Sequence, residues 1–234
     1  MIEKLLKNVK MEEVDEGIFS CLPQNERGSD YDEKVNAYDL IVGNAVYNRV
    51  VWGNWPKNYK RFCREAIASK PEGIFLDAGC GSLVFTAHVY AEANNECVIL
   101  FDRSIGMLKK GRARLRKLCG RVPKNIVFLH GDVFDLPFKE AVFDTVASFG
   151  LLHIFEEKVG LLAELERSKK ASGKMFFSML VGNSIPGRKY LELLRKAGEV
   201  AECHSSESLA ELLLRSPFDY KLETIGNMAF GRSA

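Results

Sequence analysis

The sequence lacks the features that define several common classes of protein. It contains no run of about 18 apolar residues, the minimum for a membrane-spanning helix. Its first ten residues alternate charged and apolar side chains, unlike a secretory signal peptide. Neither charge dominates, because 33 Lys and Arg stand against 31 Asp and Glu, which disfavours binding driven by a polyanion. These absences predict a cytoplasmic protein without a membrane partner, and with nucleic acid as a disfavoured partner.

The six cysteines do not form a metal or redox motif. No two of them have the C-x-x-C spacing, which excludes zinc-finger and thioredoxin-like sites. Scattered cysteines in a chain large enough to bury its own core are typical of free thiols in a reducing compartment. The sequence therefore predicts free thiols and no metal site at Cys21, Cys63, Cys80, Cys97, Cys119 and Cys203.

The 234 residues fall into three parts. Residues 1–35 form a polar extension, in which a short helix near Leu5 is expected to lie outside the core. Residues 36–70 are rich in aromatic side chains and predict a helical lid, with one helix beginning at Pro56. Residues 71–234 are expected to form the main domain.

Within the main domain, short apolar runs alternate with amphipathic segments of helical length. The apolar runs predict buried strands at Ile74–Leu76, Val98–Phe101, Ile126–Leu129, Thr145–Ser148 and Met175–Leu180. The segments between them predict helices at Leu83–Asn94, Ile105–Cys119 and Glu156–Lys170. Two last runs, Tyr220–Ile225 and Met228–Phe230, flank a two-residue turn and predict an antiparallel hairpin. The expected fold is α/β: a Rossmann-like, mostly parallel seven-stranded sheet with helices on both faces, a C-terminal hairpin and an N-terminal helical lid.

Polar residues follow the first three expected strands, at the edge where an open α/β sheet binds its ligands. Asp77 with Gly79 and Gly81 follows the first strand, Asp102 the second and Asp132 the third. The glycines let backbone amides approach a ligand at a helix N-terminus. Three carboxylates are therefore expected at one edge of the sheet.

This set of residues favours a cationic ligand. A dinucleotide pyrophosphate would be repelled by Asp77, and Val84 stands where a dinucleotide-binding loop has its third glycine. A suitable ligand carries an ammonium for Asp77, a carboxylate for the helix N-terminus, a ribose diol for Asp102 and an adenine amino group for Asp132. S-adenosylmethionine has all four groups, and its product after methyl transfer is S-adenosylhomocysteine.

From about Tyr38 to Leu180 the sequence resembles the class I S-adenosylmethionine-dependent methyltransferases, in particular the small-molecule branch with the ubiquinone and menaquinone C-methyltransferases. Five segments in order carry the resemblance. They are Leu76-Asp77-Ala78-Gly79-Cys80-Gly81, Phe101-Asp102-Arg103-Ser104 with Met107-Leu108, Gly131-Asp132-Val133, Phe143-Asp144 with Ser148 to His153, and Ser172-Gly173-Lys174.

The resemblance implies a role for each matching residue. Asp77 would accept from the methionyl amino group, and Asp102 would bind both ribose hydroxyls. The backbone of Ala78, Gly79, Cys80 and Gly81 would face the methionyl portion. It also implies that the adenine lies among Arg103, Met107, Asp132 and Val133, and that the sulfonium lies beside Ser148 and Phe149.

On the acceptor side, His153 is a candidate base because the pKa of histidine lies near neutrality. Its alternative role is a hydrogen bond to backbone beneath the cofactor. Tyr38, Tyr47 and Trp52 of the lid are candidates for an acceptor pocket, or else pack the lid onto the sheet.

Two alternatives to a small-molecule methyltransferase stay open. The basic segment 109–124 would suit RNA, such as tRNA, although a solvated helix face is the favoured explanation. Leu83 replaces the family's third loop glycine, and Leu152 the first histidine of a Leu-His-His sequence, which leaves room for a catalytically silent cofactor-binding protein. Oligomeric state has no signal in the sequence.

Overall fold

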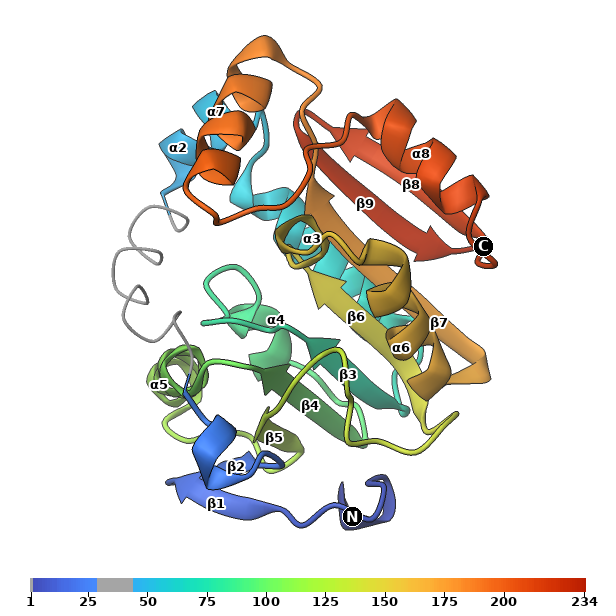
Figure 1. Cartoon of the computed structure of the whole chain (residues 1–234). Coiled ribbons are helices and arrows are strands. Elements are labelled where there is room, and N and C mark those ends of the chain that lie inside the picture. Colours follow the sequence, from blue (N-terminus) through green and yellow to red (C-terminus); the bar gives the residue numbers. More distant parts are fainter. Residues whose placement is uncertain (1, 29–43) are drawn as a thin grey trace.

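The structure is a computed structural model that describes residues 2–28 and 44–234 (Figure 1). Within these ranges the chain forms a nine-stranded sheet with the order β1-β2-β5-β4-β3-β6-β7-β9-β8. The strands are β1 Glu12–Asp15, β2 Ile18–Ser20, β3 Ile74–Ala78, β4 Cys97–Asp102, β5 Ile126–His130, β6 Phe143–Phe149, β7 Lys169–Leu180, β8 Tyr220–Ile225 and β9 Met228–Ser233. The α-helices are α2 Ala45–Val51, α3 Pro56–Ala68, α4 Ala87–Ala91, α5 Ile105–Cys119, α6 Lys158–Ser168, α7 Ile185–Lys196 and α8 Ser206–Leu214. The short 3-10 helices are η1 Ile2–Lys4, η2 Gln24–Glu26 and η3 Leu152–Ile154.

The sheet confirms the predicted α/β fold. Five neighbouring strands are parallel, in the order β5, β4, β3, β6 and β7. The strand β9 pairs antiparallel with both β7 and β8. The turn Gly226-Asn227 joins β8 to β9, as the sequence predicts. All six cysteines are free thiols, also as predicted.

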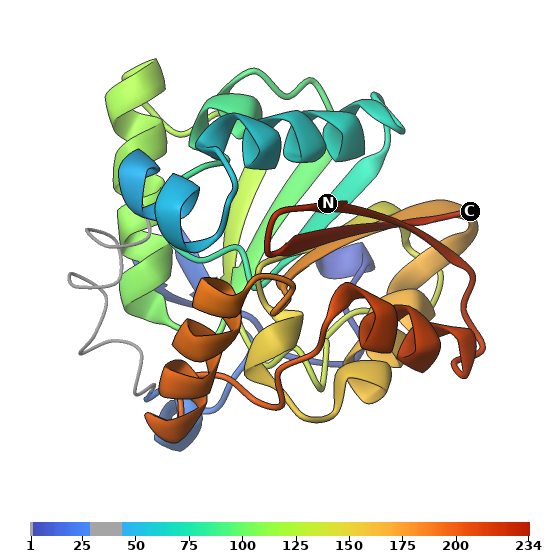
Figure 2. The same ribbon diagram turned by 90° about the horizontal axis from the view of Figure 1, so that it is seen from above.

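Helices lie on both faces of the sheet (Figure 2), and buried apolar residues fill the space on each side. On one face, α3, α4 and α5 bury Phe62, Tyr90 and Leu108. On the other face, α6 and α8 bury Leu161 and Leu209. The helices thus cover a central sheet whose strands are apolar on both sides, which explains the near-continuous apolar runs in the sequence.

α5 begins and ends at the predicted residues. At its start, Ser104 Oγ accepts a 3.1 Å hydrogen bond from the Met107 N–H, the usual arrangement of an N-cap. At its end, Gly120 adopts φ 74°, a left-handed conformation that glycine reaches without steric cost. The helix therefore follows directly from local sequence signals.

α4 is shorter than the predicted helix Leu83–Asn94. Leu83 has a positive φ of 59°, which lies outside the right-handed helical region. Its side chain is buried against Gly111, where an added Cβ would lie 2.9 Å from it. The packing of Leu83 on α5 thus keeps the loop after β3 irregular until Ala87.

The expectation that the segment around Leu5 lies outside the core is wrong. Leu5 and Leu6 are 8% and 3% exposed, and Leu6 forms a bridge with Phe138. Further along, β2 pairs in parallel with β5 and buries Ile18 completely, while β1 pairs with β2. The strands β1 and β2 therefore add to the seven strands that the sequence predicts. They cover the edge of β5, which would otherwise be exposed.

Candidate functional site

The site lies at the carboxyl ends of β3, β4 and β6. β3 stands between β4 and β6, so the strand order reverses here, and open α/β sheets bind ligands at such a point. Asp77 is in register with Ala147, which places Ser148 beside Ala78 on the neighbouring strand. The structure thus brings the residues predicted from separate motifs to one edge of the sheet.

Asp77 is a buried carboxylate without a cation. Its side chain belongs to a residue that is 1% exposed, and Oδ2 accepts a 2.6 Å hydrogen bond from the Tyr90 hydroxyl. Among the described residues, Oδ1 has no hydrogen-bond partner. Burial raises the pKa of the Asp77 carboxyl to about 7; the Tyr90 hydrogen bond opposes this rise, and the Asp102 carboxylate adds to it.

Tyr90 is a site residue that the sequence analysis misses. It lies on α4, is fully buried, and orients the carboxylate of Asp77. No motif marks it, because its contact depends on how α4 packs against β3. Only its distance of 13 residues from Asp77, within the next expected helix, could have suggested the pair.

The loop after β3 is fastened to β4 by backbone hydrogen bonds. The N–H groups of Gly79 and Cys80 donate to the Phe101 carbonyl at 2.8 and 3.0 Å. Gly79 has φ 77°, and a Cβ there would lie 2.6 Å from the Leu151 side chain. Both the conformation and the packing therefore require glycine at this position.

Asp102 joins the same loop to the start of α5. Its Oδ2 accepts a 2.7 Å hydrogen bond from the Gly81 N–H, and its Oδ1 accepts a 2.9 Å bond from the Ser104 N–H. The two oxygens therefore face backbone donors from two loops. This places Asp102 between the glycine loop and the predicted adenine side of the site.

The predicted adenine-side residues follow β5. The Gly131 N–H donates to the Asp102 carbonyl at 3.1 Å, so the loop after β5 begins beside Asp102. There Asp132 is half-buried and its Oδ1 accepts a 2.9 Å bond from the Phe134 N–H. Val133 is 5% exposed, and Met107 on the adjacent start of α5 is also buried.

Arg103 is held by the N-terminal segment. Its Nη2 donates to the Glu26 carbonyl at 2.6 Å, and its Nη1 lies 3.3 Å from Nε2 of His130. His130 is fully buried, and its Nδ1 lies 2.9 Å from Ser20 Oγ. His130 was not among the predicted site residues, although it directly precedes the Gly131 motif. A residue predicted to flank the adenine is thus fixed by the part of the chain before the lid.

Ser148 and Phe149 end β6 beside the β3 loop. Ser148 is fully buried, and its Oγ has no hydrogen-bond partner within the described ranges. Phe149 contacts Phe62 edge to face, with ring centroids 5.9 Å apart. Ser148 is therefore a second buried polar group at this edge with unused hydrogen-bonding capacity.

His153 lies on η3, next to the end of β7. Its Nδ1 accepts a 3.5 Å hydrogen bond from the Leu180 N–H, and its carbonyl accepts a 2.9 Å bond from the Ala201 N–H. Burial lowers the pKa of the imidazole to about 4, and the Lys158 ammonium lowers it further. These contacts match the packing alternative, and the role of a base stays a prediction.

The lid residues Tyr47 and Trp52 contact α7. Tyr190 of α7 lies 5.9 Å from Tyr47 and 5.4 Å from Trp52, measured between ring centroids. Trp52 is 5% exposed, so its indole packs α2 against α7. Tyr38 lies outside the described residues.

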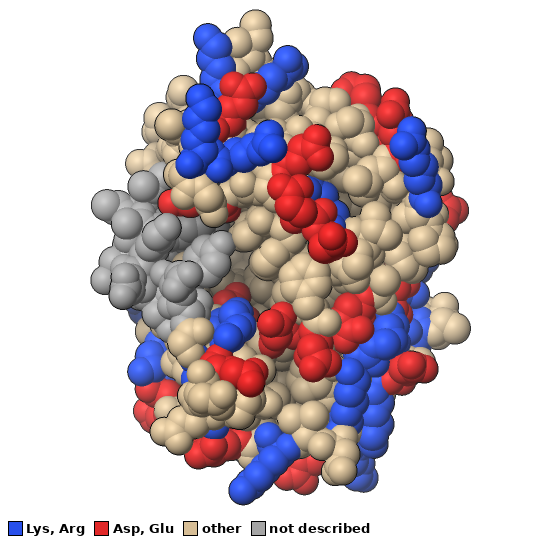
Figure 3. Space-filling view, in the orientation of Figure 1, with Lys and Arg blue, Asp and Glu red and all other residues tan. Residues whose placement is uncertain are grey.

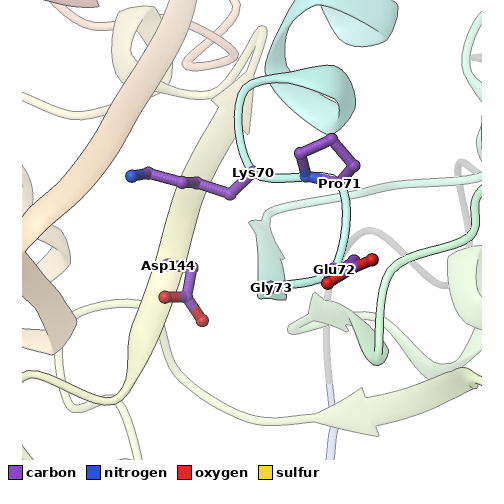
Figure 4. A pocket seen from close by; sticks show the side chains of 5 residues that line it. All are labelled: Lys70, Pro71, Glu72, Gly73 and Asp144. Carbon is purple, nitrogen blue, oxygen red and sulfur yellow. The ribbon is translucent and has the colours of Figure 1, made fainter.

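A shallow depression at the opposite end of the sheet is unrelated to this site (Figure 4). It is lined by Lys70, Pro71, Glu72, Gly73 and Asp144. Gly73 precedes β3 and Asp144 begins β6, so both lie at the amino ends of the strands. Asp144 there accepts hydrogen bonds from the Ile74 N–H and from Lys170. Asp144 is therefore a structural residue.

Three of the six basic side chains on α5 form ion pairs with two acidic residues near β1. Lys109 and Arg112 pair with Asp15 at 2.6 and 2.8 Å, and Arg116 pairs with Glu16 at 2.6 Å. These acidic residues lie at the end of β1 and in the turn that follows. These two carboxylates offset part of the positive charge on which the RNA alternative depends.

The site fits S-adenosylmethionine on its own chemistry. Oδ1 of Asp77 is a buried acceptor that lacks a donor among the described residues, and an ammonium group would supply one. The glycine loop presents backbone at the same edge, and Asp102 offers two carboxylate oxygens near it.

In the described part of the chain, no helix is both long and apolar enough to cross a bilayer.

Comparison with known proteins agrees with this geometry. Residues 75–173 match a family model described as a methyltransferase domain. A demethylmenaquinone methyltransferase of Mycolicibacterium gilvum is 33% identical over 177 residues, covering 74% of this chain and 69% of that protein. Other relatives of the same name are covered over 58% and 54% of their lengths.

Solved structures share the fold at lower identity. A methyltransferase of Thermotoga maritima, described as a possible histamine N-methyltransferase, aligns with a TM-score of 0.57 and 18% identity over 85% of this chain and 98% of that chain. Phosphoethanolamine N-methyltransferase 2 of Haemonchus contortus, in complex with S-adenosylhomocysteine, aligns with a TM-score of 0.62 and 21% identity over 85% of this chain and 44% of that chain. The chain belongs to the class I S-adenosylmethionine-dependent methyltransferases, and S-adenosylmethionine is its cofactor.

Proposed function

We propose that this enzyme transfers a methyl group to a small-molecule acceptor, specifically an aromatic quinol. The observation that carries the proposal is the 33% identity to a demethylmenaquinone methyltransferase over 74% of the chain. The ion pairs on α5 support it, because Asp15 and Glu16 already offset part of the positive charge that a polyanionic substrate would bind.

On the cofactor side, each residue has a role that follows from its contacts. S-adenosylmethionine supplies an electrophilic methyl group on a sulfonium when it is bound. Asp77 would accept from the methionyl ammonium through Oδ1, while Tyr90 keeps the carboxylate oriented through Oδ2. Asp102 would accept from the ribose hydroxyls, and Gly79 and Gly81 would let the backbone approach the methionyl portion without side chains at those two positions.

We propose an in-line displacement at the methyl carbon. Positive charge disperses in such a transfer, so the protein contributes mainly alignment, which supplies about 7–11 kcal/mol in favourable intramolecular cases. A quinol acceptor ionises readily enough to need only a weak base. His153 is neutral at physiological pH, because its pKa is lowered to about 4, so it has the protonation state but not the strength of an efficient base.

The test is methyl transfer by the purified protein, measured as release of S-adenosylhomocysteine. We expect turnover with a reduced naphthoquinone that lacks the ring methyl group, and none with bulk tRNA. Asp102→Ala should abolish turnover and cofactor binding together. Asp135→Ala is the matched control, because Asp135 is an exposed carboxylate of the same region whose side chain pairs with Lys7 on the surface.

Turnover with tRNA and none with the quinol would overturn the proposal. Binding of S-adenosylmethionine without turnover on either substrate would refute the quinol as acceptor and leave the cofactor assignment standing.

A further inference from the structure

The outward faces of α2 and α7 carry an unusual combination of exposed apolar and basic side chains. Large apolar residues are exposed at Val46 (67%), Val50 (71%), Ile185 (69%) and Leu193 (59%). Half of the exposed large apolar residues in the described part of the chain therefore lie on these two short helices.

The two helices form one surface because their inner sides pack together. Tyr47 and Trp52 meet Tyr190 edge to face, and Leu191 is 1% exposed in the same cluster. On α7, the buried Gly187 and Leu191 occupy the side opposite Ile185, Lys189 and Lys196. Ile185, Lys189 and Lys196 thus point away from the protein, while Arg188 lies at the side of α7 and donates to the Gly182 carbonyl at 3.3 Å. We name the exposed apolar and basic residues of the two helices the lid face. It consists of Val46, Arg49, Val50, Ile185, Arg188, Lys189, Leu193, Arg195 and Lys196.

The lid face is strongly basic. It carries Arg49, Arg188, Lys189, Arg195 and Lys196, and none of these forms an ion pair within the described ranges. Figure 3 shows Lys and Arg side chains gathered at the top of the molecule, where Figure 1 places α7. Glu192 is the one acidic residue within α7. The sequence has no Asp or Glu at all from Leu40 to Arg64.

We propose that the lid face docks reversibly on the surface of an anionic lipid bilayer. Aliphatic side chains flanked by cations are the arrangement that binds the boundary between headgroups and acyl chains. Each Lys or Arg near an anionic surface strengthens binding about fivefold. Trp55 is 43% exposed next to α2, and tryptophan is enriched at this boundary.

Other occupants fit the surface less well. Two copies of the lid face would repel each other, because both carry the same excess of positive charge. Single-stranded RNA binds through stacked aromatic side chains, whereas the exposed residues of α2 and α7 are aliphatic.

The proposal concerns the surface of a membrane and not its interior. It replaces the expectation of no membrane partner and does not depend on the identity of the methyl acceptor.

The test is sedimentation of the full chain with lipid vesicles, without substrate. We expect binding to vesicles that contain phosphatidylglycerol, no binding to pure phosphatidylcholine, and weaker binding at about 0.5 M salt than at about 0.1 M. The chain has two tryptophans, one buried and one exposed, so the emission of Trp55 should shift to shorter wavelength on binding. Trp55→Phe should remove the shift.

Variants separate the lid face from the rest of the surface. Lys189→Glu with Lys196→Glu should weaken binding at least a hundredfold, because each change replaces a favourable charge by an unfavourable one. Leu193→Ser should weaken it about tenfold. Leu214→Ser with Lys124→Glu is the control, because Leu214 is 84% exposed on α8. Equal binding of all variants, binding to neutral vesicles alone, or binding to tRNA with none to vesicles would overturn the proposal.

Discussion

Asp77 gives the sharpest prediction, because its burial acts on stability and on cofactor binding in opposite directions. Its folded pKa of about 7 lies above the ordinary 3.8, so the folded protein holds the proton more tightly than the unfolded chain. Stability contributed by this group is present at low pH and is lost as the pH rises from about 4 to about 7. Above that range the ionised carboxyl destabilises the cofactor-free fold by about 4 kcal/mol.

Asp77→Asn removes that charge and keeps an oxygen for the Tyr90 hydroxyl. The new amide leaves a buried N–H₂ without a partner, which costs about 1–3 kcal/mol. The net gain at about pH 8 is therefore about 2 kcal/mol, or roughly 4–8 °C in the melting temperature of a protein of this size. At about pH 4 the gain disappears and the variant is less stable than the wild type.

The assay is thermal unfolding of the cofactor-free protein between about pH 4 and pH 9, followed by circular dichroism. Asp144→Asn is a control variant for which we expect the pH dependence of stability to have the opposite sign. Burial raises the pKa of Asp144, but hydrogen bonds from the Ile74 N–H and Lys170 lower it below its usual range. That variant should lose stability at neutral pH and recover at low pH. A melting difference between Asp77→Asn and wild type that does not change with pH would refute the reasoning. S-adenosylmethionine should also raise the melting temperature of Asp77→Asn less than that of the wild type.

Three further predictions follow from single contacts. Asn227 joins Val51 and Ser184 through its side chain, so Asn227→Ala should destabilise the fold by about 3 kcal/mol, measured by urea unfolding. An unchanged midpoint would contradict this. His153→Asn should lower kcat less than tenfold, because a group with a pKa of about 4 is a poor base near neutrality; a loss above a hundredfold would instead establish it as the base. Asp15→Asn should delay elution from heparin, because it frees Lys109 and Arg112; unchanged elution would show that α5 is not masked by β1.

Local sequence patterns predict the parts of this protein that depend on neighbours in the chain. α5 begins after Ser104 and ends before Gly120 because a cap and a glycine suffice to define those ends. The Asp77 and Asp102 motifs follow buried strands, so they meet at one edge of any parallel sheet with this order. The meeting of these carboxylates at one edge of the sheet was therefore predictable from the sequence.

The same patterns fail where contacts join distant segments. Leu83 delays the start of the expected helix to Ala87 because it packs against Gly111, 28 residues away, whose missing side chain makes room for it. The polar N-terminal extension adds β1 and β2 to the sheet because an open edge of β5 is available to it. No composition or periodicity within residues 1–35 indicates that edge.

Local sequence patterns were enough to predict the seven strands of the main domain, the glycine loop and the carboxylates that point to the cofactor. Only the tertiary structure decided that Tyr90 orients Asp77, that three basic side chains of α5 pair with Asp15 and Glu16, and that α2 and α7 present one apolar and basic face. The physical reason is that backbone conformation and burial periodicity are local properties. The pKa of a carboxyl, the ion pairs of a helix and the exposure of a surface depend on side chains that only folding brings together.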